Sequence, residues 1–139
     1  KSGPIYLCAE TFGEVVHIGA GQTIYGGLDC TAGWAYTSSK KSEISPDAGL
    51  VPLVVDPGIG VDVEDVAFRA KDAADAGGSS IAIIATKGAD VSLTRCDVEA
   101  GVAKGTAAAE GSAAMYGMLG ALPDRDMVRD LVLEVLDGL

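Results

Sequence analysis

The stretch VDVEDVAFRA at residues 61–70 decides the fold, because its pattern of apolar side chains returns at residues 91–100 as VSLTRCDVEA. Few residues are identical between the two stretches. Five apolar positions of the first stretch nevertheless meet an apolar residue 30 positions later, in the pairs Val61/Val91, Val63/Leu93, Val66/Cys96, Phe68/Val98 and Ala70/Ala100. Alternation of apolar and polar residues is typical of strands with one buried face. The two stretches therefore predict equivalent strands.

The repeat extends toward the N-terminus of both stretches. VPLVVDPGIG, starting at Val51, aligns with IAIIATKGAD, starting at Ile81, at the same offset of 30, and the polar, Gly-rich loop 71–80 joins the two copies. Repeat periods of about 20–50 residues indicate solenoids, propellers or arrays. In a solenoid, equivalent residues of neighbouring coils lie about 4.8 Å apart, so buried positions must stay apolar while outward ones vary. We therefore predict that Arg69 and Glu99 are outward neighbours.

Several segments resemble the coils of right-handed parallel β-helix proteins, the pectin-lyase-like superfamily: VDVEDVAFRAKDA and GADVSLTRCDVEAG. With GPIYLCAETF and TIYGGLDCTAGW, the chain is most similar to Cys-containing, Gly/Ala-rich secreted bacterial β-helix proteins. The resemblance implies an all-β fold, a short right-handed parallel β-helix over residues 1–105. Polysaccharide lyases of this superfamily hold calcium with Asp residues on one outer face.

The C-terminal part departs from the repeat. Residues 106–122 are a low-complexity stretch that predicts a flexible connection, and residues 123–139 carry the signals of an amphipathic α-helix. Pro123 and Asp124 mark its start. One apolar stripe of the helix contains Val128, Leu131, Val135 and Leu136. We expect this stripe to dock on an apolar strip of its own β-helix (Pro52, Val54, Ala82 and Ile84), on its last coil, or on a neighbouring molecule.

Charge excludes several partners. The chain of 139 residues carries 10 Lys and Arg against 20 Asp and Glu, a net charge of −10, which disfavours nucleic acid and anionic membrane surfaces. No run approaches the ~18 apolar residues of a membrane span. We expect no cofactor; calcium, which acidic surfaces can hold, is the one exception kept open.

Three cysteines bear on the compartment. Cys8 and Cys30 lie near turn-rich sequence and are predicted to pair, whereas Cys96 falls on the apolar face of the repeat and is predicted to be a free, buried thiol. A disulfide is typical of an oxidising compartment, so a secreted, periplasmic or cell-surface location is expected. The chain begins at Lys1 without Met, which suggests a processed product or a fragment.

Candidate chemistry is sparse. Asp62 and Glu64 could form a catalytic carboxylate pair, but so could many solvated surface pairs. Tyr25, Trp34 and Tyr36 form the densest aromatic cluster of the sequence. These rings either stack on sugars at the surface or pack over the first coil. We expect a non-catalytic secreted or cell-surface module with a structural, adhesive or assembly role; the alternative is a polysaccharide-binding or polysaccharide-degrading protein.

Overall fold

The computed structural model describes residues 3–105, and these residues form an all-β unit with almost no helix. The strands are β1 (Ile5–Cys8), β2 (Thr11–Phe12), β3 (Val16–Ile18), β4 (Gln22–Asp29), β5 (Ala35–Tyr36), β6 (Ser42–Ile44), β7 (Leu53–Val55), β8 (Gly60–Glu64), β9 (Val66–Arg69), β10 (Ile83–Ala85), β11 (Asp90–Thr94) and β12 (Asp97–Glu99). One short 3-10 helix, η1 (Cys30–Ala32), follows β4. The predicted all-β class is confirmed for this part of the chain.

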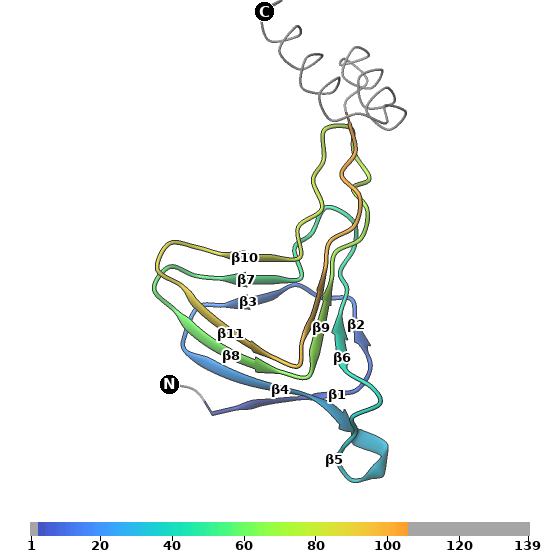
Figure 1. Cartoon of the computed structure of the whole chain (residues 1–139), viewed down its shortest axis with the longest axis vertical. Helices are drawn as coiled ribbons and strands as arrows, with labels where there is room; N and C mark the ends of the chain where they lie inside the picture. The colour runs from blue at the N-terminus through green and yellow to red at the C-terminus, as the bar shows by residue number, and fades with distance from the viewer. Residues whose placement is uncertain (1–2, 106–139) are drawn as a thin grey trace, which may run out of the picture. The chain divides into compact units, whose positions relative to one another are not determined.

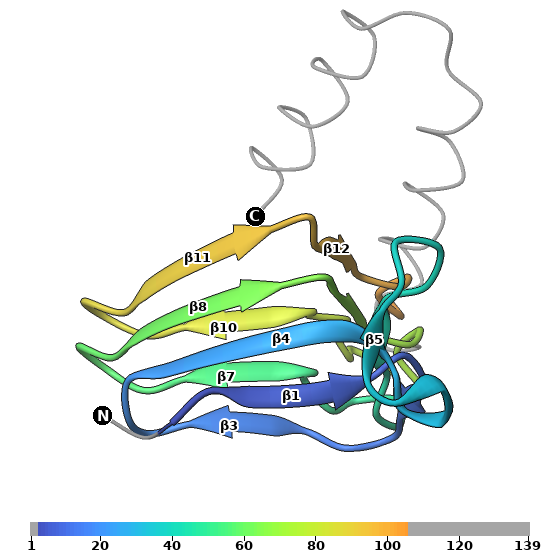
Figure 2. The ribbon, with the colours of Figure 1, turned by 90° about the horizontal axis from the view of Figure 1, so that it is seen from below.

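The strands form three sheets around a shared core (Figure 1). Sheet A has the order β1-β4-β8-β11, sheet B the order β12-β9-β6-β2 and sheet C the order β10-β7-β3. All of these pairs are parallel; β5 alone pairs antiparallel, with β4. The chain visits sheets C, A and B in turn and then returns to C one layer further along, so each sheet gains one strand per pass (Figure 2).

The register confirms the 30-residue repeat. Asp62 pairs with Ser92 in sheet A, Leu53 with Ile83 in sheet C, and Arg69 with Glu99 in sheet B. As predicted, Arg69 and Glu99 are outward neighbours. The Arg69 guanidinium donates a hydrogen bond to Glu99 and another, of 2.9 Å, to Glu43 in the preceding layer.

The core lies between the three sheets and is filled by branched aliphatic side chains and one phenylalanine. Its buried members are Ile18, Ile24, Ile44, Leu53, Val55, Val61, Val63, Val66 and Phe68. In the middle layers the inward positions are closed on both sides. The equivalent residues of the β10–β12 layer, such as Leu93 and Val98, stay partly exposed, because no further described layer covers them.

The prediction of an apolar outer strip is wrong for two of its four residues. Pro52 and Ala82 are buried, while Val54 and Ile84 are half-buried. The strand alternation used to place them does not reach Pro52 and Ala82, since β7 and β10 begin one residue later. These two residues lie at the corners between sheets, where neighbouring segments cover them.

The disulfide prediction is confirmed. Cys8 and Cys30 are bonded, with a Cα–Cα distance of 5.5 Å, and Cys96 is free and half-buried. Burial raises the pKa of the Cys96 thiol, in keeping with a packing role. The predicted connection 106–122, the helix 123–139 and its docking stripe lie outside the described residues. Among residues 3–105, no helix is long and apolar enough to cross a bilayer.

Candidate functional site

The outward side of sheet A is the most chemically distinctive surface of the described residues. Because Ile24 and Val63 point into the core, the side chains next to them in β4 and β8 point outward. Register then aligns Tyr6, Tyr25, Glu64 and Thr94 in one row across four strands, and Thr23, Asp62 and Ser92 in a second row. We call these seven residues the outer face. Each of them is aromatic or carries a hydroxyl or carboxylate.

Two tyrosines form a platform at one end of the outer face. The rings of Tyr6 and Tyr25 are stacked, with centroids 5.6 Å apart and planes inclined by 20°. They border a cavity of about 420 Å³, here called the tyrosine pocket, whose lining is completed by Gly26, Leu28, Tyr36, Glu64, Asp65 and Arg95. The pocket therefore combines exposed aromatic faces with a charged wall.

The charged wall is built at the corner between sheets A and B. Asp65 and Arg95 occupy the same position of the repeat, and both adopt the left-handed backbone, with φ values of 57° and 51°. A non-glycine residue there costs about 1–3 kcal/mol unless its surroundings hold it. Arg95 donates to both carboxylate oxygens of Asp65, at 3.0 and 2.8 Å, and to Glu64 at 2.8 Å. This network holds the corner in shape.

The same contacts set the charge state of Asp65, whose side chain is buried. The Arg95 guanidinium, helped by the Tyr36 hydroxyl, holds the pKa of the Asp65 carboxyl below its usual range, although burial acts in the opposite direction. The folded protein thus favours the ionised carboxylate. Its contribution to stability is complete above the ordinary Asp pKa of about 4 and is lost as the pH falls through the lower folded value.

The lowered pKa of Asp65 leads to a prediction about how stability depends on pH. Asp65→Asn keeps a side chain that tolerates the left-handed backbone but removes the charge. The variant unfolds at lower urea concentration than the parent at about pH 7, and the difference shrinks as the pH falls below about 4 toward the lowered pKa of the folded carboxyl. Asp75→Asn, in the exposed loop after β9, is the control and leaves the urea midpoint unchanged. A difference between parent and Asp65→Asn that does not diminish as the pH falls below about 4 contradicts the ion-pair account.

The disulfide positions the third tyrosine of the pocket. Cys30 opens η1, and its bond to Cys8 ties this excursion to the end of β1. The chain then returns as β5, where Tyr36 pairs with Leu28 of β4. From there the Tyr36 hydroxyl donates to Asp65 at 3.1 Å. Tyr36 is thereby fixed against the charged wall.

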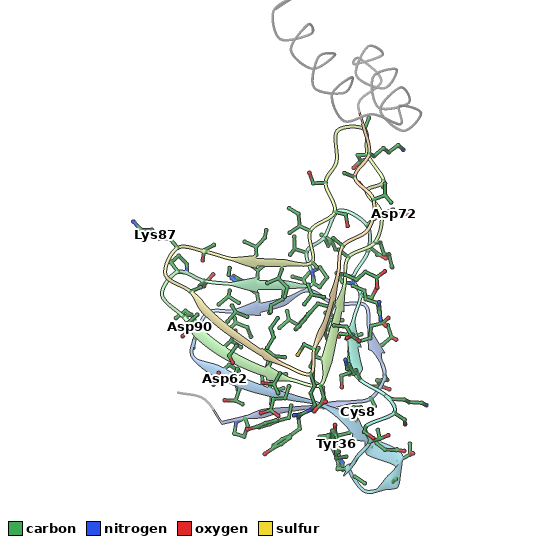
Figure 3. The ribbon with its side chains drawn as sticks, in the orientation of Figure 1. Cys8, Tyr36, Asp62, Asp72, Lys87 and Asp90 are labelled. Atoms are coloured by element: carbon green, nitrogen blue, oxygen red, sulfur yellow. A yellow bond between two sulfur atoms is a disulfide. The ribbon has the colours of Figure 1, made fainter. Side chains whose placement is uncertain are left out.

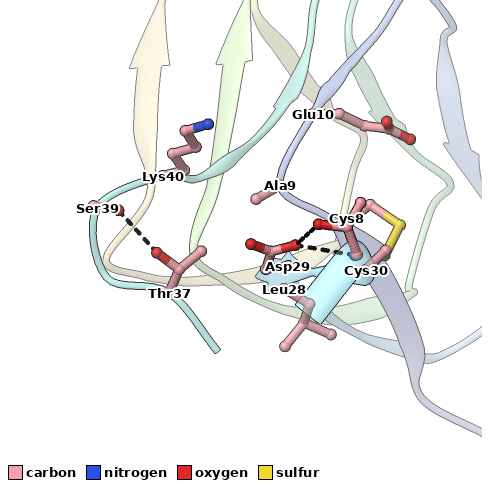
Figure 4. A pocket seen from close by; sticks show the side chains of 10 residues that line it. Cys8, Ala9, Glu10, Leu28, Asp29, Cys30, Thr37, Ser39 and Lys40 are labelled. Atoms are coloured by element: carbon pink, nitrogen blue, oxygen red, sulfur yellow. Dashed lines mark hydrogen bonds between the residues drawn. A yellow bond between two sulfur atoms is a disulfide. The ribbon is translucent and has the colours of Figure 1, made fainter. Parts of the chain in front are cut away.

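A second cavity, of about 290 Å³, lies beside the disulfide (Figure 4). Its central acid, Asp29, accepts hydrogen bonds from the Thr31 hydroxyl and from the backbone N–H groups of Thr31 and Ala32. These bonds, that of the Thr31 hydroxyl foremost, lower the pKa of Asp29. The carboxylate is therefore used to cap η1, and the cavity has a structural explanation.

A third cavity, of about 390 Å³, lies at the opposite end of the strands of sheet A from the tyrosine pocket, and Gly21, Gly60, Asp62 and Asp90 are among its lining residues. Figure 3 shows Asp62 and Asp90 toward one end of the sheet and Tyr36 toward the other. Within residues 3–105, no three His, Cys, Asp or Glu side chains gather in a way that could hold a metal ion. The cavity thus offers two carboxylates but no calcium cage.

The structure brings together two of the three aromatic residues singled out in the sequence. Tyr25 and Tyr36 line the tyrosine pocket, whereas Trp34, which is 54% exposed and has a φ of 64°, does not. Sequence reasoning missed Tyr6, Asp65 and Arg95. A signal for the last two was present, because the 30-residue offset places an acid and a base of opposite charge at one turn of the repeat.

Comparisons of the chain with models of protein families, with curated proteins and with solved structures found no match. The outer face and the tyrosine pocket are therefore the features of the molecule that bear on its function.

Proposed function

We propose that this chain is a non-catalytic, adhesive module of a secreted, periplasmic or cell-surface protein, and that it binds a polysaccharide at the tyrosine pocket. The fold we assign to it is a short right-handed parallel β-helix of the pectin-lyase-like kind. One observation carries the function: the stacked pair of exposed Tyr6 and half-buried Tyr25 beside a wall of hydrogen-bonding groups.

Stacked aromatic rings suit a sugar because its ring has an apolar face of C–H groups and a rim of hydroxyls. The apolar face packs on an exposed tyrosine ring, and the hydroxyls need donors and acceptors nearby. Glu64 accepts, Arg95 donates, and the pocket of about 420 Å³ falls in the size range of small-molecule sites. Both needs of a sugar ring are thus met in one place.

The state of the acids argues for binding rather than cleavage. Glycoside hydrolysis needs a carboxylic acid whose raised pKa keeps it protonated near neutral pH. The pKa of Asp65 is lowered instead, and both Asp65 and Glu64 are engaged by the Arg95 guanidinium. Neither group is arranged as a proton donor.

The layered topology supports the β-helix assignment. Each pass of the chain adds one parallel strand to each of three sheets, and the last two layers are related by an offset of 30 residues in all three. Parallel crossover connections within one sheet are almost always right-handed. The Cys8–Cys30 disulfide supports an oxidising compartment.

Tyrosine substitution tests the proposal. A glycan array, followed by calorimetric titration, identifies a saccharide that binds the parent protein. Tyr25→Ala then weakens binding at least tenfold, roughly the loss expected when an aromatic anchor is removed, while Tyr25→Phe keeps most of the affinity because the ring remains.

Trp34→Ala is the matched control. Trp34 is as exposed as Tyr6 but does not line the pocket, so its removal leaves the affinity unchanged. Loss of binding in Trp34→Ala with full binding in Tyr25→Ala places the sugar elsewhere and contradicts the proposed site. Absence of binding to every glycan defeats the proposed function.

A further inference from the structure

We infer that the ligand is an uncharged polysaccharide lying lengthwise along the outer face, from the tyrosine pocket to the cavity at Asp62 and Asp90. This inference rests on the proposed function and adds to it the chemical class of the sugar and the direction of its chain. It is carried by two features: the balance of charge on sheet A and the position of two cavities at its ends.

The charge balance excludes acidic sugars. Glu64 and Asp65 share the single guanidinium of Arg95, whereas Asp62 and Asp90 have no ion-pair partner within residues 3–105. Four carboxylates thus face one cation on a chain whose net charge is −10. A uronate or sulfated chain would be repelled along its whole length.

An uncharged polysaccharide is not repelled and can donate hydrogen bonds from its hydroxyl groups, since carboxylates are strong acceptors for them. The outward side chains of β4, β8 and β11 along this path include Thr23, Asp62, Ser92 and Thr94, all of which hydrogen-bond, and Asp62 itself lines the second cavity. Every second residue of a strand repeats such a contact on the same face. The outer face therefore presents a row of hydrogen-bonding groups rather than a single point.

The distance between the cavities requires more than one sugar ring. From Gly60 to Glu64, β8 advances about 13 Å at about 3.3 Å per residue. The tyrosine pocket includes Glu64, and the other cavity includes Gly60. A disaccharide stacked on the tyrosines would leave the far end, at Gly60 and its register partner Asp90, empty, and a longer chain would fill it.

The experiment compares oligosaccharides of one length and different charge on the same protein. Neutral hexasaccharides of glucose, galactose and mannose are titrated beside a galacturonate and a glucosamine hexasaccharide. One of the neutral chains binds most tightly, at least tenfold tighter than the galacturonate chain, and about 0.5 M salt leaves its affinity unchanged.

Chain direction is tested with Asp90→Ala, because Asp90 pairs with Gly60 at the far end of the path. The variant weakens the neutral hexasaccharide about tenfold, as expected for a lost hydrogen bond to a charged group, and leaves the disaccharide unchanged. Asp75→Asn, off sheet A, changes neither affinity.

Three results overturn the inference while leaving the saccharide site of the tyrosine pocket standing: preference for galacturonate, preference for glucosamine that salt abolishes, or equal loss of disaccharide and hexasaccharide affinity in Asp90→Ala. In each of these three cases the parent protein still binds an oligosaccharide, and Tyr25→Ala abolishes that binding. Failure of the proposed function differs, because the parent protein then binds no oligosaccharide at all.

Discussion

Replacing Phe68 with alanine lowers the free energy of unfolding by about 3–5 kcal/mol. Phe68 is 1% exposed and is the largest side chain of the core. Its register partners are Ile44 in the layer before and Val98 in the layer after, so its ring closes the centre of three consecutive layers. Truncation leaves a cavity that strands paired on both sides cannot collapse to fill. Against a typical stability of 5–15 kcal/mol, this loss is large.

Urea denaturation followed by far-ultraviolet circular dichroism measures the effect. Val98→Ala is the matched control: it removes an apolar side chain one layer along at the same position of the repeat, but Val98 is 50% exposed and its loss costs under about 1 kcal/mol. Equal destabilisation by the two substitutions would mean that the inward positions of β9 do not form the core.

Removing the disulfide has the second large effect. The Cys8→Ser/Cys30→Ser variant loses about 3 kcal/mol of stability, because a bond that closes a separation of 22 residues restricts the unfolded chain. The same loss appears when the parent is unfolded in the presence of a reductant. The effect is measured in a Cys96→Ala background, so that no other thiol contributes.

Cysteine alkylation checks the pairing. Unfolded without reductant, the parent exposes one reactive thiol, that of Cys96, and after reduction it exposes three. Three reactive thiols before reduction would contradict the bond. They would also remove the support for an oxidising compartment.

Periodic features of the fold could be predicted from the sequence, because residues that stack on one another in neighbouring layers must be of similar polarity. Residues such as Val63 and Leu93 must both be apolar if one lies over the other, and the offset of 30 then fixes the register between the last two layers of all three sheets. Cys8 and Cys30 could be paired because they are the two cysteines outside that apolar face.

The residues at the corners between sheets could not be predicted in the same way. Pro52 and Ala82 stand just outside their strands, where alternation no longer says which side is buried. Asp65 and Arg95 stand at a turn whose left-handed backbone no apolar pattern encodes. Tyr6 comes next to Tyr25 only through the pairing of β1 with β4, across 19 residues of sequence that the repeat does not cover.

A titration of the isotope-labelled protein with the best neutral hexasaccharide, read residue by residue by NMR, tests the central claim most directly. The account predicts that the largest shifts fall on Tyr6, Tyr25 and Arg95 and continue through Asp62 to Asp90, with the outward residues of sheets B and C unaffected. Shifts confined to sheets B or C, with the tyrosine pocket silent, would contradict it.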